Sequence, residues 1–487
     1  MQCLSKRQYW FAVVLISIGL SFSRFGMFCR DYYYMIAHAE DMISNGLYRN
    51  VDIFTVHDGF YFLYQKWAMC LLVYCMYQLG GFLLLDIMAS FTLCCLFVFV
   101  FYLTDRFNPD YRIVNLVIGT VCPVVYVFVQ SFRPHVLIGF VLLYEVYVLE
   151  EFMNDRQKSY NGLIISLFIC SLFTMWFHST MWIVCVLVVL PYLFDSRIDH
   201  YIFAVKRVVV TYGLIFMILA SFLQPNGIEQ YRYMWVCMTA AGNWYKDVVA
   251  ELHSLTYHDI GFYYVIGSLI LMFYVYSRNR RNNWSHVLLL LGFAFLALNS
   301  ERMLFDYFLL YPVLFGLGFA KADIIQVRRY QLDRINTVFT VFVCMLFTCL
   351  FLAFDQFLIV PLEAEQDGYA REVVDEITAH KDVRVWNWDS AVGSYIIMKG
   401  MKPYIDCRLE VYDDNLNHSK NVVQEYADFI IGLHEADPDK VFLDLQDEYK
   451  FNYYIVTKAF GMDVLVNELD EHGIKLFENN RYILYSL

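Results

Sequence analysis

Residues 9–28 read YWFAVVLISIGLSFSRFGMF, a stretch of twenty residues with one charged side chain. A run of this length can cross the hydrocarbon core of a bilayer as a single helix. Lys6 and Arg7 precede it, and Asp31 follows it. Basic residues mark the cytoplasmic side of a span. No small-residue cleavage motif follows the run, so the sequence predicts a retained signal anchor with a cytoplasmic N-terminus.

The rest of the chain has the same character. Of its 487 residues, 59% are hydrophobic and 17% are charged, and the mean hydropathy is +0.46. Soluble domains contain about 25% charged residues. Twelve apolar runs occur, from Tyr9–Phe28 to Val338–Val360. The composition therefore predicts a polytopic α-helical membrane protein.

Charge divides the chain into two parts. Residues 361–487 contain 25 acidic and 12 basic residues, whereas residues 1–360 are close to neutral. We therefore expect a transmembrane domain over 1–360 and a small water-soluble α/β domain over 361–487. The net charge of −12 argues against nucleic-acid binding. Twelve of the 13 cysteines lie before residue 361, mostly in apolar runs, which is typical of packing residues.

The distribution of basic residues predicts the topology. If every run crosses except Phe62–Leu79, then 16 of the 24 bases of the membrane region lie in the cytoplasm. If Phe62–Leu79 also crosses, only six do. The first arrangement predicts about 11 transmembrane helices in the plasma (inner) membrane, outer segments at 29–81 and 224–259, and an extracytoplasmic C-terminal domain. Phe62–Leu79 is then expected to be a re-entrant or interfacial helix.

The C-terminal part alternates between strand and helix patterns. Period-2 runs predict strands at 383–388, 402–407 and 453–457, with a closing hairpin of 474–477 and 482–485. Helical periodicity predicts helices at 391–399, 422–433, 439–445 and 462–468.

Asp31 is the sharpest candidate for chemistry, because it lies where the first span leaves the bilayer on the outer side. A carboxylate at that depth is costly unless it has partners or a task. It could act as a general base, or as a metal ligand, in a cavity at the outer surface. The alternative is a helix-end charge paired with Arg30. An amphipathic helix is expected from Asp31 to Gly46.

Several basic residues fall on the predicted outer side, against the general bias. Arginine at a span end can hold a phosphate with two parallel hydrogen bonds. The alternative is interfacial snorkelling. The candidates for a phosphate site are Arg133, Arg302, Arg232 and Lys66.

Histidines and carboxylates form a further set of candidates. His135 and His178 lie at neighbouring outer span ends, where they could form a metal pair or simply be hydrogen-bonded helix-end residues. Asp52 lies near His57 and Asp58 in the first outer segment, with a spacing that shows no metal specificity.

The order of these features resembles the GT-C superfamily of polyprenyl-phosphate-sugar glycosyltransferases. More closely, the chain resembles a group of bacterial multi-pass GT-C-like proteins with a C-terminal outer α/β domain. The matching segments run almost the length of the chain: 31–46, 52–55, 66–67, 133–135, 176–178, 225–227, 300–302, 385–395 and 404–408.

The resemblance implies an activity and roles for residues. The protein would transfer a sugar from a polyprenyl-phosphate donor to a glycan, lipid or protein acceptor on the outer face, with inversion. Asp31 would be the catalytic base. Arg133 and Arg302, with Arg232 or Lys66, would hold the phosphate. Secondary candidates are Asp52, His135, His178, Glu301, Asp406 and Arg408.

The sequence departs in places from the pattern of this closer bacterial group. Met35 stands where a histidine is usual, Trp176 where asparagine is usual, and Cys407 where glycine is usual. The second outer turn, Arg133-Pro134-His135, has no carboxylate. Dependence on a divalent metal therefore stays open on the sequence.

Two other functions fit parts of the same pattern. A transporter or flippase of lipid-linked glycans would also use outer arginines, but it predicts inverted repeats and charged residues near mid-span. Neither is evident in the sequence. A non-catalytic GT-C-like scaffold that binds a partner is the other alternative.

Overall fold

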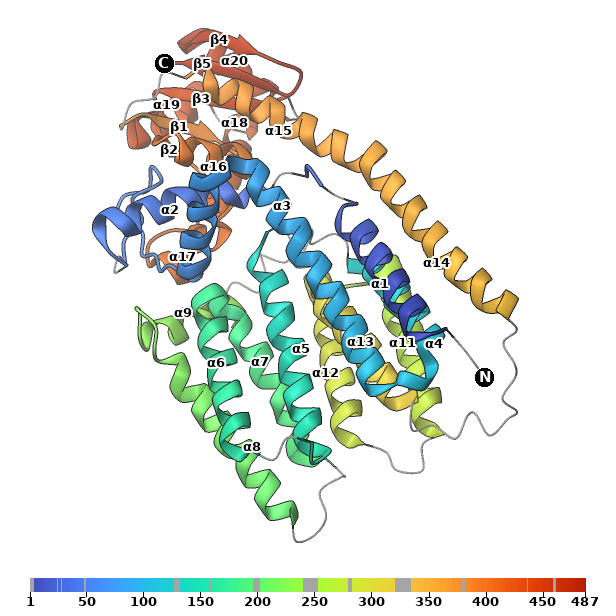
Figure 1. The fold of residues 1–487 in the computed structure, drawn as a ribbon. Helices are drawn as coiled ribbons and strands as arrows, with labels where there is room; N and C mark the ends of the chain where they lie inside the picture. The colour runs from blue at the N-terminus through green and yellow to red at the C-terminus, as the bar shows by residue number, and fades with distance from the viewer. Residues whose placement is uncertain are drawn as a thin grey trace. The chain divides into compact units, whose positions relative to one another are not determined.

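The computed structural model describes residues 4–23, 25–27, 29–47, 50–126, 132–156, 159–195, 202–239, 253–278, 283–319, 334–377, 382–435, 437–458 and 461–487. Figure 1 shows the course of the chain. The chain forms two compact units. One consists of Met1–Phe25, Asp86–Gln224 and Trp244–Val360, and the other consists of Gly26–Leu85, Pro225–Asn243 and Pro361–Leu487.

The first unit is a helical bundle. Its helices are α1 (Lys6–Ser21), the second part of α3 (Trp67–Phe107), α4 (Arg112–Tyr126), α5 (Pro134–Met153), α6 (Tyr160–His178), α7 (Trp182–Val189), α8 (Ile202–Ser221), α11 (Ile260–Ser277), α12 (Trp284–Asn299), α13 (Leu304–Phe319) and α14 (Arg334–Phe354). Short 3-10 turns at 109–111, 179–181, 190–194 and 301–303 connect several of them.

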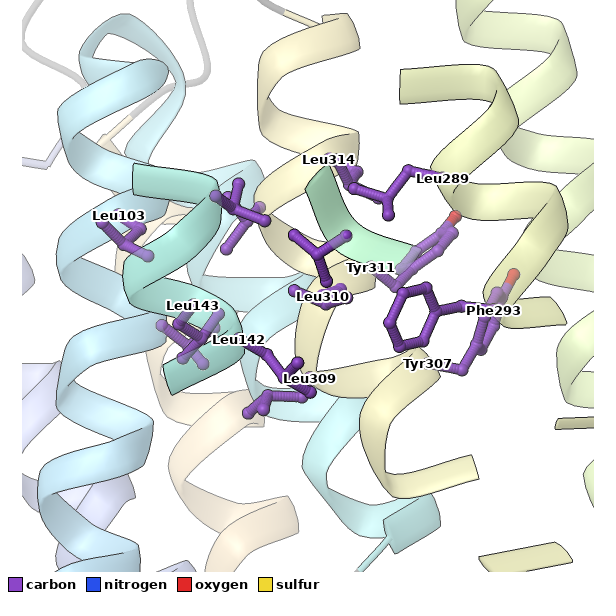
Figure 2. Packing of buried hydrophobic residues seen from close by; sticks show 14 of the residues in the cluster. Leu103, Leu142, Leu143, Leu289, Phe293, Tyr307, Leu309, Leu310, Tyr311 and Leu314 are labelled. Atoms are coloured by element: carbon purple, nitrogen blue, oxygen red, sulfur yellow. The ribbon is translucent and has the colours of Figure 1, made fainter. Parts of the chain in front are cut away.

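Helix α13 is the centre of this bundle. Every residue from Leu304 to Gly318 is buried, and α13 packs against α4, α5, α11 and α12. Asp306 is its one charged residue, and a helix that is otherwise apolar on every side is stable only when neighbours cover those sides. Figure 2 shows the packing, with Leu309 and Leu310 of α13 facing Leu142 and Leu143 of α5.

The outer helices of the bundle leave apolar side chains uncovered. In the most apolar windows of α11 and of the helical segment Val338–Asp375, only 22% and 17% of residues are buried. Five described helical segments are long and apolar enough to cross a membrane, and Trp284–Asn299 is a shorter apolar helix. The predicted class, a polytopic helical membrane protein with a small α/β region, is confirmed. The count of 11 spans remains a prediction.

The second unit contains a five-stranded sheet in the order β2-β1-β3-β5-β4. The strands are β1 (Arg384–Asn387), β2 (Lys402–Pro403), β3 (Tyr453–Thr457), β4 (Ile474–Glu478) and β5 (Tyr482–Ser486). The helices that accompany them are α15 (Val360–Asp375), α16 (Ser390–Met398), α17 (Asp414–Asn417), α18 (Val422–Glu435), α19 (Pro438–Tyr449) and α20 (Asp463–His472). Strands β2, β1 and β3 are parallel, whereas β5 pairs antiparallel with both β3 and β4.

One predicted strand is much shorter than expected. The sequence predicts 402–407, but β2 ends at Pro403. The Asn387 side chain donates to the Ile405 carbonyl oxygen at 2.8 Å, which replaces a ladder bond. Gly393 of α16 permits this close approach, because a β-carbon there would lie 1.7 Å from the same oxygen. The chain then leaves the sheet, and Asp406 and Arg408 enter a buried cluster.

The first outer segment belongs to this second unit. Helix α2 (Asp31–Asn45) ends at Gly46, where φ is +90°. The predicted helix is present, and it is buried along most of its length. Phe62–Lys66 is not helical, and α3 begins at Trp67, with a break at Gly80 and Gly81. The sequence prediction therefore placed the start of this helix five residues too early.

Candidate functional site

Asp31 is the first residue of α2 and is half-buried. The free backbone N–H groups in the first turn of a helix favour negative charge at that place. Tyr33 holds the helix in the unit. The centre of its ring lies 4.7 Å from that of Tyr395 in α16, and its hydroxyl lies 3.4 and 3.3 Å from the two carboxyl oxygens of Asp367. Asp31 is thus fixed on a buried, well-packed element.

Charged and polar groups surround Asp31. Burial raises the pKa of the Cys407 thiol to about 12, and the negative charge of Asp31 adds to this rise. Burial also raises the pKa of Glu410, and the charges of Lys66 and Arg408 oppose the rise while those of Asp406 and Asp31 favour it. Lys66 lies 5.2 Å from the ring centre of Tyr34. The first outer segment and the C-terminal part thus together supply the surroundings of Asp31.

A narrow cavity of about 10 Å³ lies among these groups, large enough for about one water molecule. Its lining includes Tyr34, His38, Phe62, Lys66, Arg408 and Glu410. Burial, with the charges of Arg408 and Lys66, holds the pKa of His38 well below its ordinary value. Within the described residues, the Nε2 atom of His38 has no hydrogen-bond partner.

Arg408 is the centre of a fully buried ion cluster. Its Nη1 donates to Asp52 at 2.6 Å, and its Nε and Nη2 donate to the two oxygens of Asp406 at 2.9 and 2.7 Å. The guanidinium lies over the rings of Phe54 and Phe62, at 5.3 and 5.1 Å from their centres. Burial disfavours its charge, but Asp406 and Asp52 outweigh that cost and raise the pKa of Arg408 well above its usual range.

The cluster joins two distant parts of the sequence. Asp52 belongs to the first outer segment, and it also accepts hydrogen bonds from the Thr55 backbone and hydroxyl. His57 adds a second link, because its Nε2 lies 2.8 Å from the carbonyl oxygen of Tyr404. The arrangement favours a structural role for Asp52, Asp406 and Arg408 over direct contact with a substrate.

Arg232 is also in the second unit, on α9 (Glu229–Thr239), and its side chain is exposed. Helix α9 packs against α17. Lys66 therefore lies in the surroundings of Asp31, whereas Arg232 projects from a helix of the second outer segment.

The other predicted residues lie in the first unit. There the structure brings together Arg302, His135 and His178. The Nη2 atom of Arg302 lies 3.3 Å from Nδ1 of His135, and the rings of His135 and His178 are 4.9 Å apart in an edge-to-face arrangement. A guanidinium only donates, so Nδ1 of His135 accepts and its proton resides on Nε2.

Arg133 and Glu301 lie in the turns that flank this group. Arg133 is the half-buried N-cap residue of α5, directly before Pro134. Glu301 is exposed and opens the 3-10 turn that contains Arg302. Three turns of the bundle therefore contribute to this group: the start of α5, the end of α6 and the turn before α13.

Two buried carboxyl groups were not among the residues predicted from the sequence. Glu145 of α5 and Asp306 of α13 are both 0% exposed, and none of their carboxyl oxygens has a hydrogen-bond partner within the described residues. Glu150 and His286 are also buried, but they contact each other, with Oε1 of Glu150 2.6 Å from Nε2 of His286. Glu145 lies inside an apolar run, so the expectation of no charged residue near mid-span was wrong. Ionisable residues inside a membrane are rarely without function.

A metal-binding arrangement is present in the described residues only at Asp439, Glu468 and His472 in the C-terminal part. His472 already contacts Asp439 at 2.6 Å. Neither Asp31 nor the pair of His135 and His178 belongs to such a group of three ligands in the described residues.

Comparison with known proteins gives matches in structure alone. No family model and no curated protein sequence matches the chain. The structure of an Archaeoglobus fulgidus oligosaccharyltransferase tethered to an acceptor peptide matches with a TM-score of 0.59 at 10% identity, covering 99% of this chain and 74% of that one. Its apo form matches with a TM-score of 0.55 at 10% identity, over 93% of this chain and 70% of that one.

A second protein matches over the length of both chains. ArnT from Cupriavidus metallidurans, bound to undecaprenyl phosphate, has a TM-score of 0.58 at 8% identity and covers 98% of this chain and 97% of that one. Both matched proteins are GT-C membrane transferases. The resemblance stated from the sequence is confirmed at the level of structure: the chain has the GT-C fold.

Proposed function

We propose that this protein is an integral membrane glycosyltransferase that moves a sugar from a polyprenyl-phosphate donor to an acceptor on the outer face of the membrane. The observation that carries the proposal is the match of the whole chain to a structure that holds undecaprenyl phosphate. The acceptor is a hydroxyl group of a glycan, lipid or protein. The oligosaccharyltransferase structure holds an acceptor peptide, which supports a protein as one class of acceptor without specifying its nucleophilic atom.

Asp31 is the proposed base. It would take the proton from the acceptor hydroxyl as that oxygen attacks the anomeric carbon of the donor sugar. The bond from this carbon to the phosphate oxygen breaks at the same time, so the new glycosidic bond has the inverted configuration. The position of Asp31 at the start of a buried helix supports this role, because the site is fixed and the helix end favours negative charge.

Arg302 and Arg133 are the proposed phosphate ligands. As the sugar leaves, negative charge grows on the polyprenyl phosphate, and fixed cations stabilise it. The contact of Arg302 with His135 supports the proposal, since it holds the guanidinium in a defined place beside two histidines. Lys66 and Arg232 are proposed as further cations of the outer side.

The test of the proposal is the transfer activity of Asp31→Asn. An amide cannot accept the proton, so we expect a loss of about 10²–10⁴-fold in rate, with unchanged expression. Glu40→Gln is the matched control, because Glu40 is an exposed carboxylate on the same helix. Near wild-type turnover in Asp31→Asn, or an equal loss in Glu40→Gln, would refute the assignment of the base.

A specific observation also favours the rival function, transport of lipid-linked glycans. Glu145 and Asp306 are buried carboxyl groups within the helical bundle, as transporters often have. Glu145→Gln separates the two functions. A glycosyltransferase should keep its transfer activity in this variant, whereas a transporter that depends on Glu145 should lose movement of a labelled lipid-linked glycan across proteoliposome membranes.

A further inference from the structure

A hollow of about 470 Å³ lies in the C-terminal part of the second unit. Sites for small molecules usually have volumes of about 300–1,000 Å³. The hollow is lined by Trp388, Asp389, Thr457, Lys458, Asn480 and Arg481. None of these residues has a part in the proposed transfer reaction.

The hollow lies where the sheet topology favours a ligand site. Trp388 and Asp389 directly follow β1. Thr457 is the last residue of β3, and Lys458 follows it. The carboxyl ends of two adjacent parallel strands therefore contribute residues to the hollow. From β1 the chain runs through α16 to β2 on one side. It then returns through α18 and α19 to β3 on the other side. Ligands of open α/β sheets bind at such a point, where the strand order reverses.

Trp388 provides a flat apolar surface in this hollow. Its ring is stacked on that of Tyr426, with centres 3.3 Å apart and planes 3° from parallel. The side chain is only half-buried, although a tryptophan carries one of the largest apolar surfaces of any residue. A rigid, partly uncovered indole in a polar hollow is suited to the apolar C–H face of a sugar ring.

The polar groups of the hollow are fixed and balanced in charge. Asp389 caps the Ala391 N–H at 2.9 Å and accepts from the Tyr482 hydroxyl at 2.7 Å, and Arg481 lies 3.4 Å from it. Lys458 pairs with Glu478 at 2.6 Å. A phosphate would meet the Asp389 carboxylate and two cations that already have anionic partners, so the site offers little for an anion.

Neutral hydroxyl groups fit these partners better. A hydroxyl both donates and accepts, and it can therefore use the carboxylate of Asp389, the amide of Asn480 and the guanidinium of Arg481 together. We propose that this hollow binds a neutral sugar ring, a hexose or an N-acetylhexosamine, stacked on Trp388. The sugar is assigned to the acceptor glycan. Binding of a sugar in the hollow does not depend on the proposed function, but this assignment rests on it.

The test is direct binding of mannotriose and chitotriose to the full chain, by saturation-transfer NMR and calorimetry in a detergent without a sugar headgroup. We expect at least one of them to bind, and Trp388→Leu to weaken its binding at least tenfold, a factor of about 1.4 kcal/mol. Trp388→Phe should restore most of the affinity. Trp235→Leu is the matched control, because Trp235 is 67% exposed on α9, and it should bind as the wild type does.

Several outcomes overturn the proposal. These are no binding of either trisaccharide to the wild type, unchanged binding in Trp388→Leu, an equal loss in Trp235→Leu, or a preference for inorganic phosphate. If Trp388→Leu does not fold, Arg481→Gln replaces it, and we expect this variant to lose at least fivefold in affinity.

Two further measurements test which substrate supplies the sugar and whether the proposed function holds. If the acceptor supplies the sugar, Trp388→Leu raises the KM for the acceptor and leaves the affinity for the polyprenyl-phosphate donor unchanged; the reverse pattern overturns the acceptor assignment. Asp31→Asn should bind the trisaccharide as the wild type does. Binding through Trp388 in a protein with no transferase activity would refute the proposed function and leave the binding site standing.

Discussion

Removal of the Arg408 guanidinium should destabilise the second unit strongly. The side chain is 1% exposed and donates three side-chain hydrogen bonds to Asp52 and Asp406, which are both 0% exposed. In Arg408→Met the two carboxylates stay buried without their cation. Breaking a buried ion pair in this way costs about 3–5 kcal/mol of unfolding free energy.

The same geometry predicts a smaller effect for Asp52→Asn. The wild-type cluster has one positive and two negative charges, so loss of the Asp52 charge leaves a neutral pair of Arg408 and Asp406. The amide keeps one acceptor for either Arg408 or the Thr55 donors, but not for both. One hydrogen bond to a charged group is worth about 1.5–3 kcal/mol. Asp52→Asn should therefore cost less than Arg408→Met.

The assay is native-state proteolysis of the full chain in detergent, with cleavage products that map to the second unit. A loss of 3–5 kcal/mol raises the population of the open state by about 10²–10³-fold or more. The reasoning fails if Arg408→Met lies within about 1 kcal/mol of the wild type, or if Asp52→Asn is the more damaging change.

Separate features of the molecule support three more predictions. Burial lowers the pKa of His57 to about 3, so between pH 6.5 and 4 the unfolded chain binds a proton that the folded chain does not. His57 alone should lower the unfolding free energy by about 1.4 kcal/mol for each pH unit by which the pH is lowered. In denaturant titrations at several pH values, His57→Gln should reduce the measured pH dependence by that amount. An unchanged pH dependence would contradict the low pKa of the buried imidazole. Arg133→Lys and Arg302→Lys should each weaken donor-lipid binding by about 1–3 kcal/mol, because lysine cannot form the bidentate contact, whereas Arg106→Lys, which contacts Glu151 at 3.0 Å, should not; equal effects in donor affinities measured in detergent would mean that the first two are interfacial anchors. A reporter active only outside the cytoplasm, fused after Leu487, should be active, and activity of a cytoplasmic reporter alone would show that the predicted topology is wrong.

Much of the C-terminal part could be predicted from the sequence, because its elements follow local patterns. Strand β3 matches its predicted range, and β4 and β5 each extend one residue beyond the two strands of the predicted hairpin. The short β2 could not be predicted. Its end depends on the Asn387 amide and on Gly393, which are brought to Ile405 by the fold and not by adjacent sequence.

The candidate residues show the same division. Asp31 was found from its place after an apolar run, and α2 begins there. The partnership of Asp52 with Arg408 joins residues 356 positions apart, which no local pattern reveals. Glu145 and Asp306 were not among the predicted residues, and the reason is a different one. Each lies inside an apolar helix pattern, so only the structure shows that no described residue pairs with them.

The central claim is transfer of a sugar from a polyprenyl phosphate, and the products of a single turnover test it most directly. The measurement is NMR of the product formed by the purified protein from a donor that carries ¹³C at the anomeric carbon, together with mass spectrometry of the released lipid. We expect one polyprenyl phosphate for each new glycosidic bond and an inverted anomeric carbon. A product with retained configuration, or a transferred sugar without release of polyprenyl phosphate, would contradict the claim.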